Sequence, residues 1–208
     1  MLVKVCGMRE PSNVSELLDK VSPDLMGMIF FPKSSRYVGL SSPELEVADV
    51  EKVGVFVNRP LAEVKKIADQ FNLSYIQLHG DEALEYLQEL KGITSAKIIK
   101  VFRVEESIDW DELKALEPYV KYFLFDTQTK QYGGSGKKFD WSILEHYPLE
   151  KPFLLSGGID GDNVEKIKEL AMKVPQLAGV DINSKFEIKA ALKDVEKIKT
   201  FVEALKSN

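Results

Sequence analysis

Short apolar runs of β-branched and aromatic residues recur along the whole chain and predict eight β-strands. The apolar residues mostly occupy consecutive positions instead of alternating with polar ones, a pattern typical of strands that are buried on both faces of a parallel sheet. The predicted strands are Leu2–Cys6, Leu25–Phe30, Val53–Val57, Tyr75–Leu78, Lys97–Val101, Tyr122–Phe125, Phe153–Leu155 and Gly179–Ile182.

Helical patterns lie between these runs. Apolar residues spaced three and four apart predict amphipathic helices that pack one face on the sheet. Ser12 or Asn13 is expected to cap the first helix, and Asp162 or Asn163 a later one. The predicted helices are Val14–Lys20, a weak Pro43–Asp49, Leu61–Gln70, Asp81–Leu90, Trp110–Leu116, Phe139–His146, Val164–Met172 and Ala190–Leu205.

The regular alternation of strand and helix predicts a (β/α)8 TIM barrel that forms one domain over residues 1–208. A doubly wound open sheet is the main alternative. That fold commonly has five or six strands, and no dinucleotide-binding fingerprint follows the first strand here. The barrel is therefore the favoured architecture.

Composition narrows the range of functions. The chain is 44% hydrophobic with a net charge of −5, which indicates a globular protein and argues against nucleic acid or an anionic membrane as its partner. Lys4 and Arg9 interrupt the apolar N-terminus, so we expect no signal peptide. One cysteine and two histidines leave little material for a metal site. We expect a cytoplasmic protein, monomer or homodimer, that acts on a small molecule without metal or other cofactor.

Candidate chemistry gathers where the predicted strands end. In a parallel barrel, functional groups collect at the carboxyl ends of the strands. Those ends are richer in polar and reactive residues than the strands that precede them. The residues are Cys6, Gly7, Arg36, Asn58, Arg59, His79, Gly80, Arg103, Asp126, Ser156, Gly157, Gly158, Asp181, Asn183 and Ser184.

The seventh strand ends in Ser156-Gly157-Gly158 and is followed by a predicted helix. Glycine lets the backbone approach a ligand closely, and N–H groups near a helix start favour an anion. Barrels often bind phosphate with the loops after strands seven and eight, where Asn183 and Ser184 add donors. We expect a phosphate site here; a simple tight turn is the alternative for the glycine pair.

Cys6 and Asp126 end the first and sixth strands and form a candidate base–acid couple. A lone cysteine is commonly a small buried apolar residue, and an aspartate after a strand commonly caps a turn. An unperturbed thiol is only a few per cent thiolate at neutral pH; apolar burial would lower that fraction further, whereas a helix N-terminus or a cation would raise it. Asp126 needs a desolvated pocket or a nearby thiolate to keep its proton.

Two further segments are candidates for the site. Arg36 carries a guanidinium that suits bidentate pairing with a carboxylate, although most arginines are surface charges. Thr127–Lys137 contains three glycines and either closes over the site or is a solvated surface loop.

Several motifs together resemble one enzyme family. They are Lys4–Gly7 (KVCG), Phe31–Tyr37 (FPKSSRY), Val53–Asn58 (VGVFVN), Gln77–Glu82 (QLHGDE), Asp126–Thr127, Tyr132–Lys137 (YGGSGK), Phe139–Trp141 (FDW), Leu155–Ile159 (LSGGI) and Asn163–Val164. In this order and spacing the chain resembles the phosphoribosylanthranilate isomerases, which are (β/α)8 barrels of tryptophan biosynthesis. Each fragment is modest, but together they cover almost the whole chain.

The resemblance implies a cofactor-free Amadori rearrangement. The substrate would be N-(5-phosphoribosyl)anthranilate and the product 1-(2-carboxyphenylamino)-1-deoxyribulose 5-phosphate. By the same resemblance Cys6 is the general base, Asp126 the general acid, and Arg36 the partner of the anthranilate carboxylate. Gly157, Gly158, Asn183 and Ser184 fall where the family holds phosphate, and Gln77, His79 and Asp181 fall at positions that face the pocket. The family commonly has a glycine where this chain has Lys185, which leaves the backbone path after strand eight open.

Two other functions remain. A related isomerisation of a phosphoribosyl aminoimidazole carboxamide in histidine synthesis would be expected to use an aspartate in place of Cys6, and a second Ser-Gly-Gly in the first half of the chain. Neither feature is present in the sequence. A barrel that binds a phosphosugar without catalysis is the other possibility, and the presence of both Cys6 and Asp126 argues against it.

Overall fold

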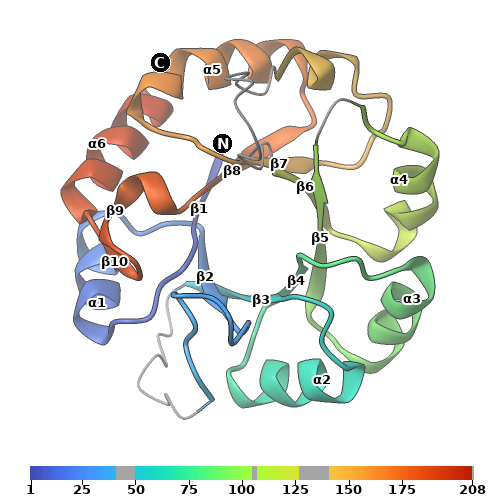
Figure 1. Ribbon diagram of the computed structural model, residues 1–208. Helices are drawn as coiled ribbons and strands as arrows, with labels where there is room; N and C mark the ends of the chain where they lie inside the picture. The colour runs from blue at the N-terminus through green and yellow to red at the C-terminus, as the bar shows by residue number, and fades with distance from the viewer. Residues whose placement is uncertain (41–49, 105–106, 127–140, 208) are drawn as a thin grey trace, which may run out of the picture.

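Eight parallel strands close into a barrel (Figure 1), in a computed structural model that describes residues 1–40, 50–104, 107–126 and 141–207. Each strand pairs with the next in sequence, and the last pairs with the first. The strands are β1 Leu2–Val5, β2 Leu25–Ile29, β3 Glu51–Phe56, β4 Tyr75–Leu78, β5 Lys97–Arg103, β6 Tyr122–Asp126, β7 Phe153–Ser156 and β8 Leu177–Ile182. The predicted barrel is confirmed, and the open-sheet alternative is wrong.

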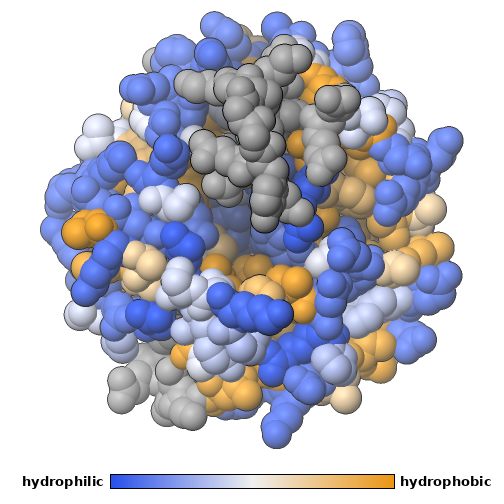
Figure 2. Space-filling view, in the orientation of Figure 1, coloured by the Kyte–Doolittle hydropathy of each residue, from blue (hydrophilic) through white to orange (hydrophobic). Residues whose placement is uncertain are grey.

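Helices surround the barrel, and hydrophilic residues cover most of the face that Figure 2 shows. They are α1 Pro11–Lys20, α2 Leu61–Gln70, α3 Leu84–Ile93, α4 Trp110–Leu116, α5 Val164–Lys173 and α6 Val195–Lys206, with 3-10 turns η2 Glu117–Tyr119, η3 Trp141–His146, η4 Gly161–Asn163 and η5 Ser184–Phe186. Within the described residues, none of the helices has the length and apolar content needed to cross a bilayer. The predicted helix Pro43–Asp49 and the predicted loop Thr127–Lys137 lie outside the described residues.

The main difference from the predicted elements lies before the last helix. Part of the predicted helix Ala190–Leu205 is instead a hairpin of two short antiparallel strands, β9 Glu187–Lys189 and β10 Leu192–Lys193. Ala191 turns the chain with a left-handed φ of +66°. The Asp194 side chain then accepts a hydrogen bond from the Lys197 N–H at 3.0 Å and caps α6. The apolar spacing of the helix continues back into the hairpin, which is why the pattern predicted too early a start.

The predicted cap of the first helix was wrong, whereas Asn163 does stand at the N-cap position of α5, although its side chain does not cap that helix. The first helix starts at Pro11, so Asn13 lies inside it; the buried Asn13 amide binds the backbone N–H and carbonyl of Lys193, at 2.7 and 3.0 Å. Before α5, Asp160 caps the turn η4, and the Asn163 Oδ1 accepts a hydrogen bond from the Asp160 N–H at 2.8 Å. Asn13 therefore ties α1 to the hairpin instead of capping a helix.

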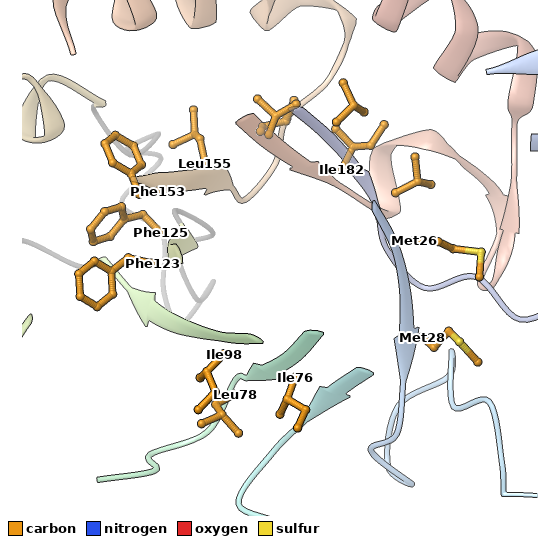
Figure 3. Close-up of a cluster of buried hydrophobic side chains, with 14 of the residues drawn as sticks. Met26, Met28, Ile76, Leu78, Ile98, Phe123, Phe125, Phe153, Leu155 and Ile182 are labelled. Carbon is orange, nitrogen blue, oxygen red and sulfur yellow. The ribbon is translucent and has the colours of Figure 1, made fainter. Parts of the chain in front are cut away.

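Side chains along each strand alternate between the barrel interior and the outer layer. Strand β6 is typical, because Phe123 and Phe125 point outward into the core beneath the helices (Figure 3), while Leu124 belongs to an interior cluster. That interior cluster is Leu25, Val53, Tyr75, Ile99, Val101, Leu124 and Leu154. The same alternation turns Asp126 inward at the end of β6.

The outer aromatic layer generates a stability prediction. Phe125 is fully buried, with its ring centroid 5.2 Å from that of Phe153 and 5.9 Å from that of Tyr147. Phe125→Ala should lower the free energy of unfolding by about 3–5 kcal/mol through lost burial and a cavity. Met172→Ala is the control, because Met172 is 78% exposed and its loss should change stability by less than about 0.5 kcal/mol. Urea denaturation measures both, and equal effects would contradict this packing.

Candidate active site

Polar side chains occupy one end of the barrel interior, beyond the apolar interior cluster. Strands β1, β4, β6 and β8 bring Lys4, Gln77, Asp126 and Asp181 to inward positions near their carboxyl ends. Cys6 follows β1 directly, and its N–H donates to the Ile182 carbonyl at 2.9 Å, which continues the pairing with β8. The structure therefore places both proposed catalytic residues, Cys6 and Asp126, at the same mouth.

An ion pair lies at the seam between the first and last strands. Lys4 and Asp181 are register partners, and the Lys4 Nζ lies 2.8 Å from the Asp181 Oδ2 in a fully buried setting. Burial raises the pKa of Asp181, with a further contribution from Asp126, while Lys4 and His79 oppose the shift. Asp181 thus interacts with Lys4 on one side and with His79 and Asp126 on the other.

Cys6 is a buried thiol among charged groups. Burial raises its pKa and Asp181 adds to the rise, while Lys4 and Lys193 lower it. Gly27 on β2 leaves the room that the thiol occupies, because a Cβ at Gly27 would stand 2.7 Å from the Cys6 Sγ. Cys6 is therefore a thiol in the free protein, and the neighbouring cations reduce the cost of ionising it.

His79 contacts Asp126 across the mouth. The His79 Nε2 lies 3.4 Å from the Asp126 Oδ2, and the Arg103 Nη2 donates to the His79 carbonyl at 3.1 Å. Residues that follow or end three successive strands, β4, β5 and β6, are thus linked by direct contacts. The structure brings the predicted residue His79 to the proposed acid.

Glu82 anchors the loop that carries His79. Its buried carboxylate accepts hydrogen bonds from the N–H groups of Asn58 and Gly80, at 2.9 and 3.0 Å, and from the Lys100 Nζ at 3.0 Å. Gly80 must be glycine, because a Cβ there would stand 2.2 Å from the Asn58 Oδ1. The predicted helix Asp81–Leu90 accordingly begins later, at Leu84, since Asp81 and Glu82 serve this loop.

Arg36 is paired with a carboxylate of the protein itself. Its Nε and Nη2 donate to the two oxygens of Glu187 at 2.9 and 2.6 Å, in the bidentate geometry that a guanidinium favours. Burial on its own raises the pKa of Glu187, but hydrogen bonds from Arg36 and Lys193 outweigh it and hold the pKa below its ordinary value. Glu187 therefore remains an anion that fixes the Arg36 side chain.

Gly7 lets Arg36 and the hairpin come close to Cys6. Its φ is +80°, and a Cβ there would stand 2.8 Å from the Arg36 Cδ, 2.8 Å from the Asn183 Oδ1 and 3.4 Å from the Lys193 Nζ. A left-handed φ and a crowded Cβ position both require glycine. Arg36, Asn183 and Lys193 thus gather beside the residue that follows the thiol.

The glycine pair after β7 adopts a backbone that favours glycine. Gly157 and Gly158 have φ values of +91° and +67°, and a Cβ on Gly158 would meet nothing within 4 Å. The backbone at Gly158 is therefore open to an approaching group. Strand β8, the neighbour of β7, ends at Ile182, so Asn183 and Ser184 follow on the adjacent strand end.

Lys185 is accommodated without backbone strain. It lies in η5 with no positive φ, and its carbonyl accepts a hydrogen bond from the Lys197 Nζ at 2.7 Å. The Asn183 side chain accepts one from the Lys193 Nζ at 2.7 Å, which fixes the amide beside Gly7. A lysine in place of the family's glycine thus leaves this turn in a conformation open to any residue.

The remaining predicted residue, Gln77, is buried on β4, and its Oε1 has no hydrogen-bond partner among the described residues. The sequence reasoning missed Lys4, Glu187 and Lys193 as members of the site. Lys4 had a signal, since a lysine inside an apolar strand must find a partner. Lys193 had none, because a helix was predicted across its position, and the partner of Glu187 lies 151 residues away in the sequence. Among the residues that the structure describes, no three histidine, cysteine or acidic side chains are grouped as a metal site.

The closed barrel and its polar mouth define the class of protein. Charged side chains that converge at the carboxyl ends of the strands, over an apolar interior, characterise the (β/α)8-barrel enzymes. Figure 2 shows both hydrophilic and hydrophobic residues around the centre of this barrel.

Comparisons with known proteins identify the family within that class. The family model of N-(5'-phosphoribosyl)anthranilate isomerases matches residues 3–204. The isomerase of Parabacteroides distasonis is 42% identical over 99% of this chain and 93% of its own length, and that of Phocaeicola vulgatus is 43% identical over 99% and 98%. The crystal structure of the Thermotoga maritima isomerase superposes with a TM-score of 0.80 at 32% identity, covering 99% of each chain. The chain belongs to the family of N-(5'-phosphoribosyl)anthranilate isomerases.

The burial of Cys6 generates a prediction about its reactivity. Alkylation by iodoacetamide in the native protein should keep accelerating at pH values where the unfolded chain has reached its plateau, because burial raises the pKa of Cys6 only in the folded state. The chain has one cysteine, so every alkylation event reports on Cys6. The same protein in urea is the reference, and a native midpoint at or below the unfolded one would refute the assignment.

Proposed function

We propose that this chain converts N-(5'-phosphoribosyl)anthranilate into 1-(2-carboxyphenylamino)-1-deoxyribulose 5-phosphate, with Cys6 as the general base and Asp126 as the general acid. The observation that carries the proposal is the placement of both groups at one mouth, each within electrostatic reach of Asp181. Membership of the isomerase family supports the substrate, and the two side chains supply the proton transfers that an Amadori rearrangement needs.

The reaction needs one proton delivered and one removed. Asp126 protonates the ring oxygen of the ribose while the anthranilate nitrogen lone pair opens the ring to a Schiff base. Cys6 then removes the proton from the sugar C2, and the enolamine that forms tautomerises to the ketone. The rearrangement is redox-neutral, and its steps are proton transfers that these two groups can perform.

Before the reaction, Cys6 must lose its proton and Asp126 must carry one. Burial holds the proton on Cys6 in the free protein, whereas the reaction needs a thiolate and a protonated Asp126. Lys4 lies on the same strand and opposes the effect of burial, so it favours the thiolate that the reaction needs.

Two anionic ends of the substrate fix its position between these groups. The described hydrogen bonds of Arg36 to Glu187 use Nε and Nη2, so a substrate carboxylate would approach the Nη1 side of the guanidinium. The phosphate would bind the backbone after β7 at Gly157 and Gly158, with Asn183 and Ser184 on the next strand end. Remote binding of this kind supplies the orientation that proton transfer needs.

The catalytic roles are tested by substitution. Cys6→Ala or Asp126→Asn should lower kcat by about 10²–10⁴-fold with little change in KM, because each removes a proton-transfer group. Asp69→Asn on α2 is the control, an exposed aspartate that should leave both constants unchanged. A fluorescence assay with substrate generated in situ measures the rates. Near-normal turnover by either catalytic variant would disprove the role assigned to it.

Arg36 is tested separately through KM. Arg36→Met should raise KM by about 10–100-fold, the loss expected for hydrogen bonds to a charged group, with a smaller change in kcat. Arg36→Lys keeps the charge but not the planar fork, and should fall between Met and the unchanged protein. A KM that does not move in Arg36→Met would contradict the carboxylate contact.

A further inference from the structure

Lys193 is a buried cation that the proposed reaction does not use. It is 1% exposed, and its Nζ donates to the Glu187 Oε1 and the Asn183 Oδ1, both at 2.7 Å. An ammonium is costly to bury, and it is retained in an interior only with close partners. These hydrogen bonds explain how the Lys193 ammonium can be buried, but they do not explain what the positive charge does at this position.

The backbone around Lys193 is held from both sides. The Asn13 amide on α1 binds the N–H and the carbonyl of Lys193, and the left-handed Ala191 sets the hairpin turn just before it. Figure 1 shows the β9–β10 hairpin beside α1. The ammonium is therefore fixed in place, unlike the end of a flexible surface lysine.

This position is next to the thiol. The Lys193 Nζ lies 3.4 Å from the point where a Cβ on Gly7 would stand, and Gly7 follows Cys6 directly. The charged groups that act on Cys6 are Lys4 on β1, Asp181 on β8, Lys193 on β10 and Arg36 in the loop after β2.

Lys193 shares its carboxylate partner with a second cation. Asp181 pairs with Lys4, whereas the single carboxylate of Glu187 is shared between Arg36 and Lys193. Glu187 therefore balances the charge of Lys193 only in part, and this cation would stabilise a thiolate at Cys6.

We propose that Lys193 is a positioning residue that acts through Cys6, its fixed ammonium stabilising the thiolate on which the proposed function rests. Burial lowers the pKa of Lys193, while Glu187 and Cys6 oppose that shift, and Lys193 in turn lowers the pKa of Cys6. The hairpin thereby serves both the residue that would bind the substrate carboxylate and the proposed base, because Glu187 fixes Arg36 and holds Lys193 at the same time.

The test compares Lys193→Gln with Lys193→Arg in the free protein. Gln keeps a hydrogen-bonding group and removes the charge, whereas Arg keeps the charge. The ultraviolet absorbance of the thiolate, followed over pH as the difference from Cys6→Ala, reports on Cys6, because the chain has one cysteine and both proteins share the same seven tyrosines. Lys193→Gln should raise the titration midpoint of Cys6 by about one pKa unit, which means a tenfold smaller thiolate fraction at any pH well below the midpoint, and Lys193→Arg should stay near the unchanged protein.

Alkylation gives a second readout with a smaller expected effect. A thiolate of higher pKa is intrinsically more nucleophilic, so a tenfold smaller thiolate fraction should slow alkylation only about threefold. Lys189→Gln is the matched control, an exposed lysine in the same hairpin that should change neither readout. An unchanged Cys6 titration in folded Lys193→Gln, or an equal shift in Lys193→Arg, would overturn the proposal.

Glu187→Gln tests the same electrostatics in the opposite direction and serves if Lys193→Gln does not fold. Loss of the Glu187 charge leaves two cations beside the thiol, so the thiolate fraction of the folded protein should increase. A fraction that is unchanged or smaller would overturn the proposal. Circular dichroism identifies the folded samples. None of these titrations uses substrate, so their failure is distinct from a failure of the isomerase assay.

Discussion

The ion pair between Lys4 and Asp181 joins β1 and β8, the two strands that close the barrel, and places two opposite charges among the side chains of the site. Both side chains are buried, and their Nζ and Oδ2 atoms lie 2.8 Å apart. Removing one partner from such a pair commonly costs about 3–5 kcal/mol, because the other charge is left buried without compensation. The pair also places a cation beneath Cys6 and a carboxylate within reach of His79 and Asp126. Closure of the fold and preparation of the site thus depend on the same contact.

Around this pair, burial and charge act on the thiol in opposite directions. Burial keeps the proton on Cys6, while Lys4 and Lys193 favour its loss. A base that is too easily ionised would be a weak proton acceptor, and one that never ionises would be inert. The surrounding cations adjust a buried thiol between these limits, and Glu187 distributes charge between Lys193 and Arg36 at the edge of the site.

The sequence predicted the strands well because buried parallel strands leave continuous apolar runs. Those runs located the strand ends, and hence Cys6, His79, Asp126 and the glycine pair. The hairpin was missed because Leu192 keeps helical spacing with Val195, although the positive φ of Ala191 interrupts the helix. The contact of Arg36 with Glu187 joins residues 151 positions apart, and no local pattern reveals such a pair. Long-range charge pairing, more than secondary structure, escaped prediction.

The central claim is that a thiol and a carboxyl from the first and sixth strands serve one ribose. A crystal structure with a reduced, unreactive form of the product tests it most directly, since a related isomerase has been crystallised with such a ligand. The account predicts the Cys6 Sγ and the Asp126 carboxylate in contact with the same sugar chain, the ligand carboxylate on Arg36, and the phosphate on Gly157 and Gly158. A ligand that leaves Cys6 or Asp126 out of contact with the sugar would contradict the account.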